Sequence, residues 1–225
     1  MDLNFLKKKT QIKLEDFCSD YYEKNILLSR REGIDLKTIF FDHVIESIAE
    51  ADSNFASLNT EKFINEMTIV RLEIFSIAWF HKFGDSLAVK NSIFTRDYLH
   101  SRNRDDIWDN SESYNQAVAR SSTLGKTHET TSGRAYLEFV TKMRVDLFNK
   151  FTKEGMDAKC VARALNRFST DIAWKNKITP GFLMLNLCDR LDCEINNEGQ
   201  FRLVAILIGL YQGVQQSFND IKIIN

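Results

Sequence analysis

Apolar residues recur along most of the chain with the spacing of a helix face. One stripe consists of Val161, Leu165, Phe168 and Ile172, and a second consists of Tyr136, Val140, Met143, Leu147 and Phe151. Residues three or four positions apart lie on the same side of an α-helix. The pattern therefore predicts amphipathic helices that share a core.

Candidate caps divide these stripes into separate helices. The N-cap candidates are Asp35, Thr60, Asp85, Asp157 and Thr179, with Pro180 after the last, and Asn197 with Gln200 forms a capping-box pattern. Gly33, Gly84 and Gly155 stand where helices should end. The predicted helices lie near 13–31, 35–51, 60–83, 86–101, 105–121, 132–154, 157–174, 180–191 and 198–218.

Two segments, Phe63–Phe83 and Phe201–Val214, carry apolar residues almost all the way round rather than along one stripe. A helix that is apolar on every side is buried. We therefore predict an all-α fold, an irregular or orthogonal bundle of about eight or nine helices around these two central helices.

One polar stretch, 121–133, is rich in Ser, Thr and Gly and predicts a loop near the middle of the chain. A loop of this length fits either a connection within a domain or a boundary between two domains. We favour a single helical domain over 1–225, with 121–133 as the place for any subdivision.

The composition agrees with a folded helical protein. Hydrophobic residues make up 44% of the chain and charged residues 27%, with one proline and nine glycines. Strand-rich proteins need more turn residues than this. The net charge of −1 gives no overall attraction to nucleic acid, which we consider an unlikely partner.

The apolar runs and the N-terminal segment indicate where in the cell the protein is expected. The longest apolar runs fall far short of the roughly 20 residues that cross a bilayer, and MDLNFLKKKT does not resemble a secretory signal. We expect a cytoplasmic protein with no membrane insertion. Its four cysteines lack CxxC spacing and are expected to be reduced.

Known catalytic and metal-binding motifs do not fit the sequence. Gly125-Lys126-Thr127 ends like a phosphate-binding loop, but Arg120 stands where that loop needs glycine. No GxSxG or HExxH motif occurs. We predict no cofactor and no metal site.

Four residues on two neighbouring helices remain as an enzymatic alternative. His43 and Glu46 share one helix face, and Glu66 and Glu73 share a face of the next helix. Antiparallel packing would bring them together as acid–base or metal-binding groups. Alternatively, Arg71 or a basic residue from another helix neutralises the two glutamates, since a buried carboxylate needs a partner.

Charge is distributed unevenly along the chain. Residues 35–75 hold eight acidic and three basic side chains, whereas 134–177 hold ten basic and five acidic. Within the basic half, Lys159, Arg163 and Arg167 form a row at intervals of four residues. We expect a solvated helix surface here, with the binding of an acidic partner as the alternative.

The segment 101–116 concentrates polar and aromatic residues at a helix start, among them Arg102, Arg104, Asp105 and Trp108. Arginine and tryptophan are typical anchors of protein interfaces, but the same residues also form tertiary networks. The sequence favours neither of the two interpretations.

Together these observations favour a non-enzymatic binding or regulatory protein that acts through a protein partner or as a homo-oligomer. Its expected binding residues are Arg102, Arg104, Asp105, Trp108, Lys159, Arg163 and Arg167. The alternative is an enzyme or metal-binding bundle with its site at His43, Glu46, Glu66 and Glu73.

Overall fold

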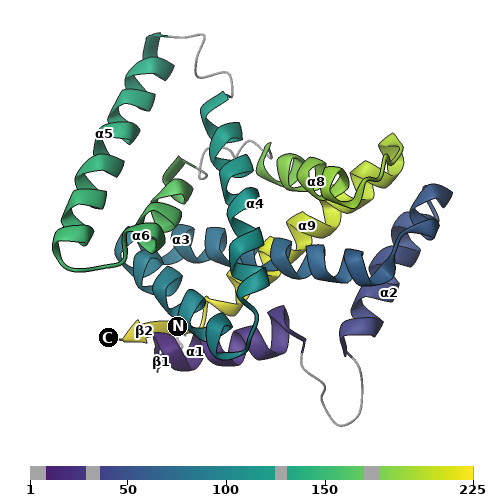
Figure 1. Ribbon diagram of the computed structural model, residues 1–225, viewed down its shortest axis with the longest axis horizontal. Coiled ribbons are helices and arrows are strands. Elements are labelled where there is room, and N and C mark those ends of the chain that lie inside the picture. The colour runs from purple at the N-terminus through teal and green to yellow at the C-terminus, as the bar shows by residue number, and fades with distance from the viewer. Residues whose placement is uncertain (1–8, 29–35, 125–130, 170–177, 225) are drawn as a thin grey trace, which may run out of the picture.

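The computed structural model describes residues 9–28, 36–124, 131–169 and 178–224 and confirms the all-α class (Figure 1). Its α-helices are α1 (Leu14–Tyr21), α2 (Leu36–Ala49), α3 (Thr60–Ser101), α4 (Asp105–Leu124), α5 (Thr131–Lys153), α6 (Ala158–Leu165), α8 (Ile178–Leu191) and α9 (Asn197–Ser217). A π-helical turn, η1 (Tyr22–Ile26), follows α1. Two 3₁₀ turns, η2 (Ser53–Ser57) and η4 (Asn166–Ser169), precede α3 and follow α6.

α3 is the central helix, as predicted. Buried residues lie on all sides of its first half, from Phe63 to Trp79. α4, α6, α8 and α9 pack around it, while α5 stands at the edge of the molecule against α6 and η4 (Figure 1). The buried side chains of these helices form one continuous cluster.

α9 differs from the prediction of a second all-round buried helix. Its buried large residues form one stripe, Leu203, Leu207, Tyr211 and Val214, and Phe201 is 73% exposed. An apolar side chain on a helix does not by itself require burial, because much of a protein surface is apolar. α9 therefore covers α3 with one face and leaves apolar residues on others.

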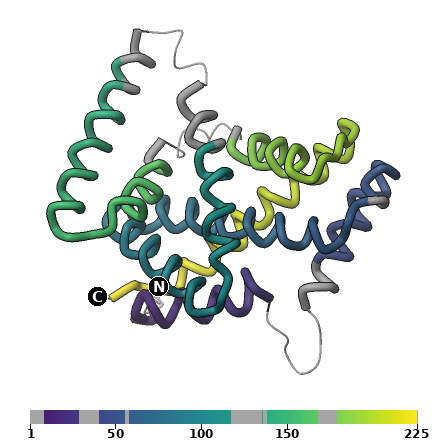
Figure 2. Tube along the Cα trace, in the orientation of Figure 1, coloured from purple at the N-terminus to yellow at the C-terminus, as the bar shows by residue number. Residues whose placement is uncertain are grey.

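A short parallel pair of strands, β1 (Thr10–Lys13) and β2 (Ile221–Ile224), joins the two ends of the described chain (Figure 2). Thr10 lies opposite Ile221 and Ile12 opposite Ile223. The sequence analysis predicted no strand here, since segments of four residues are too short to show a reliable alternation. The pair fixes the start of α1 near the end of α9.

Most predicted helix ends fall within a few residues of the observed ones. Asp157 caps α6 by accepting a hydrogen bond from the Cys160 amide at 2.8 Å. Two other caps are one residue earlier than predicted: Asn59 caps α3 and Asn196 caps α9. In each case the side-chain oxygen accepts an amide hydrogen bond from the first turn.

Other predicted boundaries need correction. Thr179 and Pro180 lie inside the first turn of α8, and Asp85 lies within α3. The loop predicted over 121–133 is wrong at both of its ends, because α4 continues to Leu124 and α5 begins at Thr131, while 125–130 lie outside the described residues. Gly33 and Asp35 lie outside the described residues, and a domain boundary within the loop stays a prediction.

None of the helices in the described ranges has a stretch long and apolar enough to cross a bilayer.

Gly84 interrupts α3 where the sequence predicted one helix to end and another to begin. Its φ of 81° and ψ of −177° are not helical. The Trp79 indole N–H donates to the Leu87 carbonyl at 3.0 Å and so bridges the break. This backbone conformation is open almost exclusively to glycine.

We therefore predict that Gly84→Ala lowers the free energy of unfolding by about 1–3 kcal/mol, because the side chain strains the backbone even though open space surrounds it. Urea denaturation measures the change. Gly181→Ala in α8 is the matched control, since its Cβ also meets open space without a positive φ. Equal stability of the two variants would contradict the prediction.

Candidate functional site

The two glutamates singled out on the central helix are held by arginines from other helices. Glu73 on α3 receives Arg163 Nη2 on one carboxylate oxygen at 2.9 Å and Arg167 Nη2 on the other at 2.8 Å. The side chain of Glu73 is 1% exposed, that of Arg163 is 3% exposed and that of Arg167 is 4% exposed. The ion pairs connect α3 to α6 and η4.

Trp108 on α4 extends this network. The guanidinium carbon of Arg163 stands 3.7 Å from the centre of the Trp108 ring, and Arg163 Nη1 donates to the Trp108 carbonyl at 2.8 Å. Glu112, one turn further along α4, lies 3.8 Å from Arg163. The carboxylates of Glu73 and Glu112 therefore balance the charges of Arg163 and Arg167. Burial lowers the pKa of Arg163.

Glu66, two turns before Glu73, has a separate partner on α8. Arg190 donates from Nε and Nη2 to the two carboxylate oxygens at 2.6 and 2.9 Å. The Tyr114 hydroxyl donates to the same carboxylate at 2.9 Å, and burial raises the pKa of that hydroxyl. This second network connects α3 and α4 to α8.

The two networks explain how a polar sequence forms a central part of the core. The buried positions of α4 include Ile107, Trp108, Ser111, Tyr114 and Asn115, which share one helix face. Three of these five, Ser111, Tyr114 and Asn115, carry polar side-chain groups, in addition to the indole N–H of Trp108. Tyr114 donates to Glu66 on α3, Asn115 donates to the Arg163 carbonyl on α6, and Ser111 donates to the Trp108 carbonyl within α4. A polar face of this kind could not be buried without such partners.

The enzymatic alternative receives no support from this geometry. His43 and Glu46 are exposed on α2, 3.6 Å apart, whereas Glu66 and Glu73 are covered by arginines. Across the described ranges, no three His, Cys, Asp or Glu side chains are grouped so that they could hold a metal ion. A metal ion or substrate at Glu73 would have to displace two buried guanidinium groups.

The expected basic row on α6 is wrong for two of its three residues. Arg163 and Arg167 are buried and bind Glu73, while Lys159 is exposed and lies 3.9 Å from Asp109. The spacing of four residues correctly predicted that Lys159 and Arg163 share a helix, but α6 ends at Leu165 and Arg167 lies in η4. The spacing could not indicate that Arg163 and Arg167 turn toward a carboxylate on α3.

Internal contacts involve the charged residues of the 101–116 segment that were proposed for binding. Arg102 pairs with Glu23 on η1 at 2.6 Å, and Asp105 contacts the His100 ring at 3.1 Å. Arg104 makes two hydrogen bonds to the Asp106 carboxylate. The Arg102 contact joins the end of α3 to η1, whereas the other two contacts are local to the junction of α3 and α4.

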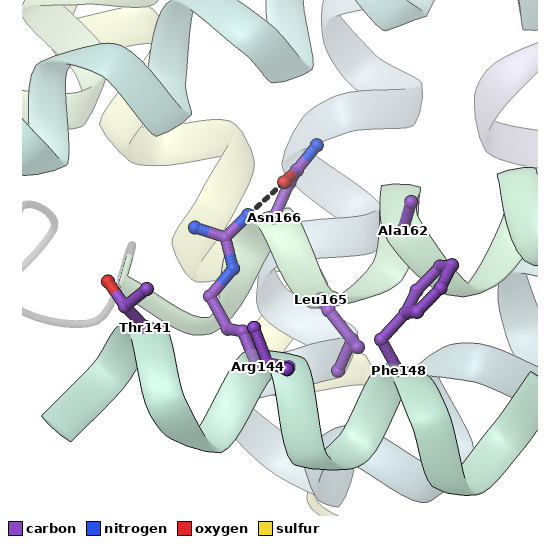
Figure 3. A pocket seen from close by; sticks show the side chains of 7 residues that line it. Thr141, Arg144, Phe148, Ala162, Leu165 and Asn166 are labelled. Atoms are coloured by element: carbon purple, nitrogen blue, oxygen red, sulfur yellow. Dashed lines mark hydrogen bonds between the residues drawn. The ribbon is translucent and has the colours of Figure 1, made fainter. Parts of the chain in front are cut away.

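The sequence analysis missed an apolar groove between α5 and α6. It has a volume of about 260 Å³ and is lined by Thr141, Arg144, Val145, Phe148, Ala162, Leu165 and Asn166 (Figure 3). Val145 is largely exposed and Phe148 partly so. Both lie off the apolar stripe predicted for α5, which was the available signal for a second apolar surface, and Phe148 also packs against the core.

Arg144 is the one charged side chain that lines this groove. Its guanidinium donates to the side-chain oxygen of Asn166 across the groove (Figure 3). Partial burial lowers the pKa of Arg144, so the charged form has lost part of its hydration. An anionic group in the groove would restore favourable contacts to it.

Comparisons with protein families, curated proteins and solved structures find no match to this chain.

We predict that Glu73→Gln lowers the free energy of unfolding by about 3–5 kcal/mol, because it leaves two buried guanidinium groups without their carboxylate. Chemical denaturation measures this loss. Glu46→Gln on exposed α2 is the control and should change stability by less than about 0.5 kcal/mol. A similar small effect at Glu73 would show that the buried network contributes little.

Proposed function

We propose that this protein is a non-enzymatic binding protein that holds an acidic amphipathic helix of a protein partner in the groove between α5 and α6. The observation that carries the proposal is the apolar groove with the half-buried Arg144 in its wall. Helices bind in apolar grooves through residues at intervals of three and four, and a charged contact fixes their orientation.

Exposed lysines border the groove on both helices. Lys142 precedes Val145 by three residues on α5, and Lys159 precedes Ala162 by three residues on α6, so each lies beside a groove residue. Lys142 also has Glu138 and Asp146 one turn away on α5, and Lys159 lies 3.9 Å from Asp109 on α4. The charged side chain in the described lining of the groove is Arg144, and this cation supports an acidic rather than a basic partner.

The internal contacts of the other arginines also support this choice of surface. Arg163 and Arg167 are used to hold α6 on α3, and Arg190 is used to hold α8. The basic half of the chain therefore offers fewer cations to a partner than its composition indicates. Lys159 is the residue of the expected basic row that remains exposed.

A labelled amphipathic peptide tests the proposal directly. The probe is a 16-residue helix with leucines on one face and glutamates on the other, and the comparison peptide carries lysines in place of the glutamates. Fluorescence anisotropy should detect binding of the acidic peptide alone, with affinity that falls as salt rises. Equal binding of both peptides would contradict the proposal.

We predict that the double variant Lys142→Glu/Lys159→Glu binds the acidic peptide roughly tenfold more weakly, because both edges of the groove then repel it. Both side chains are exposed, so the fold should persist. Lys150→Glu/Lys153→Glu applies the same charge change to α5 outside the groove lining and should have a smaller effect. Loss of binding in both variants alike would point to overall charge rather than the groove.

A further inference from the structure

A second and larger cavity, of about 750 Å³, lies between α1 with η1, α3 and α9. Its walls are mainly apolar, with side chains from all three regions that include Phe17, Tyr21, Ile26, Ile74, Leu210 and Val214. Volumes of this size are typical of small-molecule sites. The cavity is separate from the groove between α5 and α6 and shares none of its lining residues.

One buried cation lines this cavity. Arg71 on α3 is only 8% exposed, and burial lowers its pKa to about 10. It remains charged at neutral pH. The adjacent Tyr21 hydroxyl is neutral there, since burial raises its pKa to about 12. The charged group is therefore placed where a ligand anion would interact with it in a weakly hydrated environment.

The acidic residue in the lining lies toward solvent. Asp20 is well exposed and pairs with Lys24 at 2.5 Å. The remaining polar lining groups are the neutral side chains of Asn25 and Ser217. The charge pattern of the cavity is thus a buried cation in an apolar wall, with an ion pair at the exposed side.

Two glycines on α9 face the cavity without a packing reason. Gly209 and Gly213 lie one turn apart, and a Cβ at either position would meet no atom within 4 Å. Glycine is a poor residue for a helix interior, and alanine would fit both positions. By contrast, a Cβ at Gly199 would contact Asp52 and Ile195 at 3.5 Å. Space at 209 and 213 is kept open at the expense of helix stability.

We propose that this cavity binds an aliphatic carboxylate, with its carboxylate group at Arg71 and its hydrocarbon chain along Gly209 and Gly213. A buried cation in a mainly apolar wall fits a ligand that has one anionic end and one apolar end. A protein partner would instead bury roughly 800 Å² of each surface. The small molecule is favoured because side chains from three helical regions converge on this one volume.

Dodecanoate, used below its micelle-forming concentration, is the probe, and dodecanol is the matched ligand without the charge. Isothermal titration calorimetry on the full chain should show dodecanoate binding at least tenfold more tightly than dodecanol. Arg71→Gln should remove this preference. Arg202→Gln should keep it, because Arg202 on α9 pairs with Glu50 and Glu198 and does not line the cavity. Equal affinity of the wild-type protein for the two ligands would overturn the proposal, as would no binding of either.

The two glycines provide a second test, which does not depend on whether Arg71→Gln folds. Gly209→Ala/Gly213→Ala should raise the melting temperature of the ligand-free protein, because alanine favours the helix and meets open space. The same variant should bind dodecanoate several-fold more weakly, because two methyl groups enter the cavity. Unchanged dodecanoate affinity in this stabilised variant would contradict the assigned position of the chain.

Discussion

The buried carboxylate of Glu73 is the constraint on which the arrangement of the helices depends. It lies in the middle of the central helix α3, where water is excluded, and an ionised carboxylate there requires positive partners. Arg163 and Arg167 supply them and thereby fix α6 and η4 on α3. Trp108 packs under Arg163, so the position of α4 depends on the same contact. The pair of Glu66 and Arg190 repeats this arrangement two turns away and places α8.

This use of charge inside the fold determines which surfaces remain for binding. The arginines that would make the second half of the chain strongly basic are largely compensated by glutamates of α3 and α4. Arg144 lines the groove between α5 and α6 and the exposed Lys142 and Lys159 lie near it, whereas Lys150 and Lys153 are exposed elsewhere on α5. Arg71 lines the separate cavity under α9. The two proposed sites differ accordingly, one an open groove with a charged border and the other a cavity with a single internal charge.

The fold was largely predictable from the sequence, but the sites were not. Helical periodicity reports which residues share a face, and it correctly indicated the central position of α3, the cap at Asp157 and the break at Gly84. It does not report what lies opposite a face. For this reason Arg163 and Arg167 were expected at the surface, although the sequence did raise the possibility that basic residues neutralise Glu66 and Glu73. The cavity forms between helices that are distant in the sequence, and the groove depends on how the consecutive helices α5 and α6 pack against each other, so no local pattern predicts either of them.

A double-mutant cycle between Glu73 and Arg167 tests the central claim most directly. The free energy of unfolding is measured for the wild-type protein, Glu73→Gln, Arg167→Gln and the double variant. If the buried ion pair holds α3 and η4 together, the two effects are far from additive, with a coupling energy above about 1.5 kcal/mol. Additivity within about 0.5 kcal/mol would contradict the account and show that apolar packing alone sets the positions of these helices.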